Sequence, residues 1–270
     1  MRHYIARPPA PPLAEFVEYV WASKGAPSHA YERVVPTGTL ELVISLVEDG
    51  GLIRDADGRE RWMSGTLVSG AYRRPFTFAT RESSSVVGVH LRPGRAGAIL
   101  GVPSSEIVDC HVDLEALWGR RARELRERLC EATTTEQRFR ILEAELASRL
   151  REHRQHPSVA YALDVLAGPQ ARVADIAKHA GLSPRRLIEH FTTAVGLTPK
   201  RFGRILRYHR ATALARNSSL EWARVAQECG YYDQAHLIRD FRELAEMTPT
   251  DLVRASTHEQ ERHQLAVLDR

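Results

Sequence analysis

The sequence predicts an α+β chain of two domains, a β-rich sheet or barrel with trailing helices and then an all-α domain. Two observations predict this division. Short strand-like runs separated by Gly, Pro and Asp fill the first half, and apolar residues at helical spacing fill the second. A length of 270 residues suits two domains, and a hydrophobic content of 43% is ample for two cores.

The first half holds four runs rich in β-branched and aromatic residues, bounded by turn-forming residues. The segments 48–51 and 57–58 supply such Gly and Asp punctuation. Strands at this spacing favour a small sheet or barrel. The expected strands are 41–47, 66–69, 76–80 and 86–91.

From about residue 113 the apolar period becomes helical, which predicts two helices. Leu114, Leu117, Trp118, Leu125 and Leu129 mark one helix, and Phe139, Leu142, Leu146 and Leu150 mark the other. This pair either forms a dimer interface or covers the open face of its own sheet. The expected organisation is a β-rich domain at 1–150, a linker at 151–158, a helical domain at 159–256 and a tail at 257–270.

One pattern occurs twice in the second half, so one supersecondary unit is used twice. In each copy a short apolar stretch ends at a glycine, Gly181 and then Gly230, which are 49 positions apart. The later apolar residues repeat at an offset of 50, and the copies close on Thr-Pro at 198–199 and 248–249. The second copy therefore has one extra residue in its turn. A solenoid would need at least three copies.

Each copy has the features of a helix, a tight turn and a second helix. Glycine tolerates the left-handed backbone at which a helix stops. Ser183, followed by Pro184, and Asp233 are suited to cap the second helices. Ala177 and Ala226, four positions before each glycine, keep the first helix slim where the second crosses it. These are the requirements of a helix-turn-helix, whose second helix enters the DNA major groove.

A helix from Pro199 to about Arg216, capped by Thr198, is expected to join the two units. At ~1.5 Å per residue this helix spans roughly 27 Å. Adding the offsets of the units themselves places the two second helices about one DNA turn, roughly 34 Å, apart. The basic residues of the helix either face phosphates or form a solvated surface. These residues are Lys200, Arg201, Arg204, Arg207 and Arg210.

Residues 157–255 resemble the DNA-binding domain of the AraC/XylS family of bacterial transcription regulators. The motifs are Ile176-Ala177 with Gly181-Leu182-Ser183-Pro184, Leu187, Phe191 and Gly196-Leu197-Thr198-Pro199, and Val225 through Gly230-Tyr231 and His236 to Phe241 and Thr248-Pro249. The resemblance implies promoter DNA and RNA polymerase as partners. The second unit departs from the family pattern at Tyr231, Leu237 and Glu246. The first two are apolar exchanges, and Glu246 replaces a helix-ending glycine.

By this resemblance, the second helix of each unit supplies the base contacts. In the first unit, Arg185, Ile188 and Glu189 face the groove, with Arg186 and His190 beside them, and in the second unit Gln234, His236 and Arg239 do so. Arginine suits guanine, glutamine adenine, glutamate cytosine and an apolar side chain the thymine methyl. The alternative for Ile188 is packing inside, and for Arg239 a phosphate contact or an intrahelical pair.

The first half resembles the amino-terminal domain of some AraC-type regulators. The shared motifs are Pro36-x-Gly38-x-x-Glu41-Leu42 and Val89-His90-Leu91-Arg92-Pro93-Gly94, followed by Leu100-Gly101-Val102-Pro103. The resemblance implies a sensing and dimerising module with a pocket for a small-molecule effector. Aromatic residues that either line this pocket or belong to the plain core are Trp21, Trp62, Tyr72, Phe76 and Phe78.

Charge and cysteine usage fit a regulator in the cytoplasm. The net charge is +4, and residues 156–255 hold 14 Lys and Arg against 10 Asp and Glu, so the surplus lies in the helical half. The three cysteines are scattered, which suits a reducing compartment. Cys229 is expected to be a buried small hydrophobe, and Cys110 a candidate for a redox or metal thiol. Neither a membrane span nor a signal peptide is expected.

The sequence contains none of the motifs of a hydrolase elbow, a zinc protease, a phosphate-binding loop or a calcium loop. His153 and His156 have the spacing of metal ligands, but a polar linker explains them as well. We therefore expect no enzyme activity, no metal and no cofactor.

The expected function is a sequence-specific bacterial transcription factor, modulated by an effector and forming a homodimer. The alternatives are an enzyme or DNA-repair module with an appended helix-turn-helix, and a scaffold whose helical half binds protein.

Overall fold

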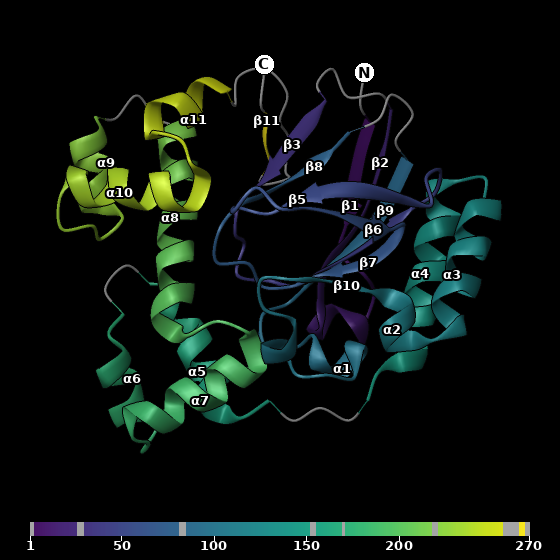
Figure 1. Ribbon diagram of the computed structural model, residues 1–270. Coiled ribbons are helices and arrows are strands. Elements are labelled where there is room, and N and C mark those ends of the chain that lie inside the picture. The colour runs from purple at the N-terminus through teal and green to yellow at the C-terminus, as the bar shows by residue number, and fades with distance from the viewer. Residues whose placement is uncertain are drawn as a thin grey trace.

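A computed structural model describes residues 3–25, 30–80, 85–151, 155–168, 171–217, 221–255 and 265–267. A β-rich domain lies beside a helical domain, and the long helix α8 (Pro199–Asn217) faces the sheets (Figure 1). The α+β architecture with a helical second domain confirms the prediction.

Two antiparallel sheets form the first domain. The first sheet has the order β1 (His3–Arg7), β2 (Val17–Lys24), β9 (Ser85–Leu91), β4 (Glu41–Ser45), β7 (Thr66–Ser69) and β10 (His111–Asp113). The second has the order β11 (Leu265–Val267), β3 (Tyr31–Val34), β8 (Phe76–Ala79), β5 (Gly50–Arg54) and β6 (Glu60–Ser64). The four predicted strands are therefore present, as β4, β7, β8 and β9.

Alternation along the strands gives the first sheet two different faces. In β4, Leu42 and Ile44 are buried in the core, whereas Val43 and Ser45 line a cavity between the two sheets. Leu42 is aligned with Val89 of β9 and Val68 of β7. One face of this sheet thus packs on helices, and the other faces the second sheet.

Three helices follow the strands: α2 (Leu114–Trp118), α3 (Arg120–Glu131) and α4 (Thr135–Arg149). The prediction of one helix from Leu114 to Leu129 is wrong, because Gly119 adopts a φ of 60° and separates α2 from α3. The second helix was predicted correctly. It begins with a reciprocal cap between Thr134 and Gln137.

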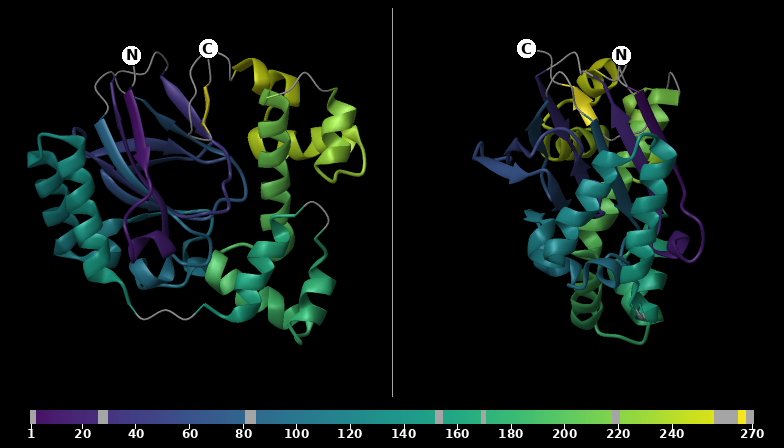
Figure 2. Two further views of the ribbon diagram at one scale, coloured as in Figure 1. Left: turned by 180° about the vertical axis from the view of Figure 1, so that it is seen from behind. Right: turned by 90° about the vertical axis from the view of Figure 1, so that its right-hand side faces the viewer.

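The helices α3 and α4 cover the outer face of their own first sheet (Figures 1 and 2). Their apolar side chains, among them Leu125, Leu129, Phe139 and Leu142, are buried in the same core as the strands. Of the two interpretations of this pair, the structure shows the covering of the sheet.

Short elements complete the first domain: η1 (Leu13–Glu15), α1 (Gly97–Leu100) and η2 (Ser104–Ile107). The segment 48–51 was predicted to separate strands, but its last two residues, Gly50 and Gly51, begin β5. A Cβ atom at Gly50 would lie 2.6 Å from the Trp62 indole nitrogen, so the glycine makes room for that ring.

The helical domain contains α5 (Pro157–Leu166), α6 (Val173–His179), α7 (Pro184–Val195), α8, α9 (Trp222–Glu228), α10 (Gln234–Ala245) and α11 (Pro249–Ala255). The two predicted helix-turn-helix units are α6–α7 and α9–α10. Gly181 and Gly230 take positive φ, 65° and 77°, in the two turns, as predicted. Unlike the prediction, α5 begins inside the segment 151–158, and β11 pairs the tail with β3.

The two domains dock through both apolar and polar contacts. A Cβ atom at Gly38 would lie 2.9 Å from the Phe202 ring of α8, so the β3–β4 connection packs closely on this helix. The His209 Nε2 atom lies 2.7 Å from the Pro36 carbonyl oxygen. Arg33 forms an ion pair of 3.1 Å with Glu246, the residue that ends α10.

Glu246 has a φ of 56°, the left-handed conformation that Gly196 supplies at the end of α7. We expect Glu246→Gly to stabilise the chain by about 1 kcal/mol, because a side chain is disfavoured in this conformation. Measuring the substitution in an Arg33→Ala background keeps the ion pair out of the comparison. A midpoint of thermal unfolding that does not rise in this background would contradict the expectation.

Candidate DNA-binding surface

The helix α7 presents a polar face and buries an apolar one. Ser183 caps it by accepting from the Arg186 backbone N–H at 3.3 Å. Leu187, Phe191 and Val195 are buried, each four positions from the next. The side chains left exposed on the other face include Arg185, Arg186, Ile188 and Glu189, all predicted DNA-binding residues. Ile188 is 38% exposed, so it does not pack inside.

The helix α10 repeats this arrangement. The Asp233 carboxylate caps it by accepting from the His236 backbone N–H at 2.6 Å. Gln234 and Arg239 are exposed, as their predicted role requires, and no ion pair of Arg239 is found among the described residues. His236 differs, because its ring is half-buried, stands edge-on to Tyr231 and lies 3.8 Å from the Asp240 carboxylate.

His190 also lies differently from its predicted neighbours. It is half-buried, and its ring centroid is 4.2 Å from that of His156 at the start of α5. Its Nδ1 atom is buried. The ring therefore contributes to the packing of α5 on α7, in contrast to the exposed side chains of Arg185 and Glu189.

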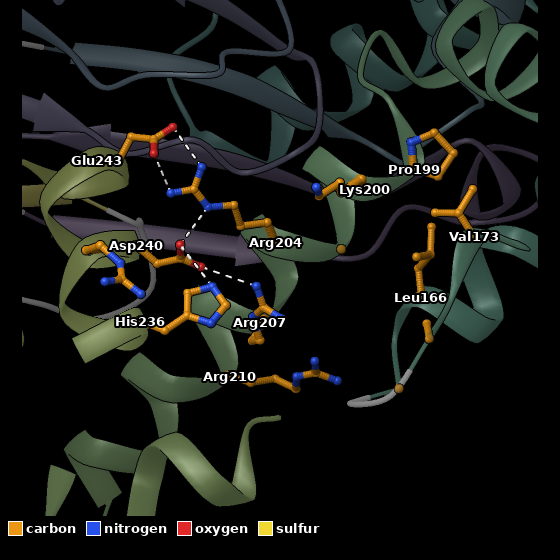
Figure 3. Close-up of a pocket in the computed structure, with 14 residues that line it drawn as sticks. Leu166, Val173, Pro199, Lys200, Arg204, Arg207, Arg210, His236, Asp240 and Glu243 are labelled. Atoms are coloured by element: carbon orange, nitrogen blue, oxygen red, sulfur yellow. Dashed lines mark hydrogen bonds and ion pairs between the residues drawn. The ribbon is translucent and has the colours of Figure 1, made fainter. Parts of the chain in front are cut away.

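The linker helix holds the second unit through an ion-pair network (Figure 3). Asp240 of α10 is only 2% exposed, and its carboxylate accepts from Arg204 Nε at 2.7 Å and from Arg207 at 3.4 Å. Arg204 also donates to Glu243 at 2.8 Å. Because a buried charge is costly without a partner, this network fixes α10 on α8.

Arg201 is also engaged within the chain, and Arg207 makes a further contact. Arg201 donates to Glu243 at 2.6 Å and to the Arg73 carbonyl oxygen of the first domain. The Arg207 guanidinium lies 4.6 Å from the centre of the Tyr231 ring. The sequence predicted that the basic residues of α8 face phosphates or solvent. In the structure Arg201, Arg204 and Arg207 contact other groups of the chain, whereas Lys200 is exposed.

The sequence reasoning missed the two carboxylates of this network. Asp240 and Glu243 lie three positions apart on one face of α10, and Arg204 and Arg207 lie three positions apart on α8. This matched spacing was the available signal. It does not identify the pairing, because the partners are more than 30 positions apart.

An open groove of about 660 Å³ runs between the two units. Its walls are the end of α5, the start of α6, one face of α8 and the face of α10 (Figure 3). The charged lining residues are Lys200, Arg204, Arg207, Arg210, Arg239, Asp240 and Glu243. Basic groups outnumber acidic ones, so the groove attracts anions.

The remaining candidate residues show no catalytic arrangement. Burial raises the pKa of the Cys110 thiol, which disfavours the reactive thiolate. Cys229 is buried, as predicted. His156 caps α5 by accepting from the Ser158 backbone N–H, and His153 lies outside the described residues. Within the described ranges, no group of His, Cys, Asp and Glu could hold a metal ion, and no helix is long and apolar enough to cross a membrane.

Two family models match the chain. Residues 176–255 match a helix-turn-helix domain, and residues 6–113 match a domain of unknown function (DUF6597). The helix-turn-helix match covers both units and the linker helix. No curated protein matches closely enough to count as a relative.

Several solved structures are similar to parts of the chain. An AraC-type transcriptional regulator from Chromobacterium violaceum has 24% identity over 39% of this chain and 96% of its own, with a TM-score of 0.36. The DNA-binding domain of AdpA in complex with a target DNA has 27% identity over 37% of this chain and 88% of its own, with a TM-score of 0.33. Fatty acid-bound ToxT from Vibrio cholerae has 10% identity over 93% of this chain and 94% of its own, with a TM-score of 0.48.

The two capped units, their exposed second helices and the family match together define a DNA-binding transcription regulator. Its helical domain is an AraC-type helix-turn-helix domain, as the motifs around Gly181 and Gly230 had indicated.

Arg204→Ala should destabilise the helical domain by about 2–4 kcal/mol, because it leaves the buried Asp240 carboxylate short of a partner. Lys200→Ala, on the same helix but exposed, should leave stability within about 0.5 kcal/mol. Denaturant unfolding of the two variants measures the difference. Equal stability of both variants would show that the network does not hold the second unit.

Hydrogen bonds from Arg204 and Arg201 lower the pKa of Glu243 from 4.5 to about 2. The stability that Glu243 contributes is therefore complete above pH 4.5 and is lost as the pH falls towards 2. Glu243→Gln should reduce the loss of thermal stability over this range, while Glu189→Gln, at an exposed position of α7, serves as the control. Identical pH profiles for wild type and Glu243→Gln would contradict the assignment.

Proposed function

We propose that this protein regulates bacterial promoters by placing α7 and α10 in two successive major-groove segments of one duplex. The carrying observation is the pair of second helices with exposed polar faces, one before α8 in the chain and one after it. Arg185 and Glu189 lie on the first, and Gln234 and Arg239 on the second. The 19 residues of α8 span roughly 28 Å at ~1.5 Å each. This length is suited to reading segments about one turn apart.

The DNA backbone between the two segments would cross the basic groove on α8. The exposed Lys200 is the side chain there that points to phosphate binding, because Arg204 and Arg207 are already paired. Arg201, Arg204 and Arg207 then contribute by holding α10 in place. This division assigns most of the salt dependence of binding to few side chains.

The first domain supports an effector-modulated regulator. A cavity of about 250 Å³ lies between its two sheets, near the lower end of the range of small-molecule sites. Trp21, Trp62, Phe76 and Phe78, four of the five aromatics considered from the sequence, line it. The fifth, Tyr72, packs against Phe76 with tilted rings and a centroid distance of 4.6 Å, just behind the wall.

The wall of this cavity touches the DNA-binding domain. Val34 and Thr37 line the cavity, and between them the Pro36 carbonyl oxygen contacts His209 of α8. On another side, Tyr72 packs on the cavity residue His111. The backbone carbonyl oxygen of the next residue, Arg73, accepts a hydrogen bond from the Arg201 guanidinium. A ligand that shifts either segment acts on α8 directly, and with it on the spacing of the two reading helices.

The proposal includes partners that follow from the regulator class. Promoter DNA is bound in the bacterial cytoplasm, RNA polymerase is contacted at the promoter, and two chains bind a doubled site as a dimer. The fold and family match point away from an enzyme, so the chain is proposed to act by binding alone.

Arg185→Ala and Arg239→Ala should each cost about 1–3 kcal/mol on the specific site and relax the preference at one or two base positions. The affected positions of the two variants should lie about one helical turn apart. Selection from a random DNA pool with wild type and both variants measures these preferences.

Lys200→Ala is the matched control, because a phosphate contact should weaken all sequences alike and lower the salt slope by about one. Variants at Arg185 and Arg239 that behave like Lys200→Ala would make these residues phosphate contacts. Two affected sets that overlap would rule out reading of successive segments.

A further inference from the structure

The cavity between the two sheets has a distinctive charge. Its described lining contains two carboxylates, Glu41 and Glu48, and no Lys or Arg. Apart from two histidines, Met63 and glycines, the remaining lining is aromatic, aliphatic or hydroxyl-bearing. A carboxylate ligand would be repelled here, whereas a cation finds both a counter-charge and aromatic faces.

The two histidines of the lining do not reverse this charge. Burial lowers the pKa of His111 to about 4, so its ring is neutral at pH 7. That ring is packed against Tyr72 and Phe76 at centroid distances of 4.9 and 4.6 Å. His90 lies between Glu18, at 3.7 Å, and Glu41, at 3.9 Å, so two carboxylates face this ring.

Glu41 is held in place for a ligand. Its Oε1 atom accepts from the Trp21 indole N–H at 2.8 Å, which fixes the carboxylate against the aromatic wall. An ionised carboxylate has about four acceptor positions, so it can accept from a ligand as well. Burial and the charge of Glu41 raise the pKa of Tyr19, which therefore stays a neutral phenol beside the site.

The aromatic rings are arranged around the same space. A Cβ atom at Gly88 would lie 2.3 Å from the Trp21 ring, so the glycine makes room for the indole. Trp62 of β6 lines the cavity although it is 60% exposed, which places this indole at the mouth. An exposed aromatic residue of this size at an opening is suited to contact an entering apolar molecule.

We infer that the effector of this regulator is a small apolar or aromatic amine, bound as its cation. The ammonium group donates to Glu41, and the apolar body packs among Trp21, Trp62 and Phe76. This inference deepens the proposed effector function and rests on it for its regulatory meaning. The binding itself requires no DNA and is tested separately.

Three probes with the same phenylpropyl body and different charge test the inference. Calorimetry, together with quenching of tryptophan fluorescence, measures binding of phenylpropylamine, phenylpropanol and phenylpropanoate to the full chain at pH 7 without DNA. We expect the amine to bind at least about tenfold more tightly than the alcohol, and the carboxylate most weakly. A carboxylate that binds as tightly as the amine, or an amine without binding, would overturn the inference.

Glu41→Gln removes the charge and keeps an acceptor for Trp21. It should weaken amine binding about tenfold or more and leave alcohol binding within about twofold, which also shows that the cavity is intact. Glu18→Gln is the matched control, because Glu18 faces the same His90 and is not among the cavity residues. Unchanged amine affinity in Glu41→Gln, or an equal loss in Glu18→Gln, would refute the role of Glu41. DNA binding by the unliganded chain is a separate measurement.

Discussion

The pairing of Asp240 with Arg204 and Arg207 is the contact on which the geometry of the DNA-binding domain depends. Because the Asp240 carboxylate is almost fully buried, α10 is stable only in positions that keep Arg204 and Arg207 within hydrogen-bonding distance of it. The second unit can therefore not rotate freely on α8. Hydrophobic packing of Phe241 and Leu237 holds the unit to the domain, but apolar contact alone is tolerant of small rotations. The directional ion pairs remove this freedom, and the separation of the two reading helices follows from them.

Much of the helical domain was predictable from the sequence, because its determinants are local. Glycines at turns, caps such as Ser183 and Asp233 and apolar spacing within a helix all act over a few residues. The roles of the α8 arginines were not predictable, because their partners come from another helix. A guanidinium with a remote carboxylate has the same local pattern as one that faces solvent. The sequence also left undecided whether Ile188 packs inside the domain or lies at the surface, and in the structure its side chain is exposed.

The strands of the first domain were predicted only in part, and the cavity explains why. An inward-facing strand residue is normally apolar, but here polar positions such as Glu41 and Ser45 line a cavity, which weakens the alternation. Gly50 and Gly51 have the composition of a turn yet begin β5, and at Gly50 the Met63 carbonyl oxygen and the Trp62 ring leave no room for a side chain. Gly119 shows the opposite case, since one glycine divided a continuous helical pattern into two helices.

The segment between β3 and β4 is at once a wall of the cavity and a support for α8. Val34 and Thr37 belong to the first role, and Pro36 and Gly38 to the second. If the cavity holds the proposed effector, ligand preference and DNA binding are therefore coupled at this segment. Substitutions that reshape this part of the cavity also move the resting state of the DNA-binding domain. Under the proposed effector function, a new ligand specificity would therefore arise together with changed DNA binding by the unliganded chain, and its refinement would require compensating changes along α8.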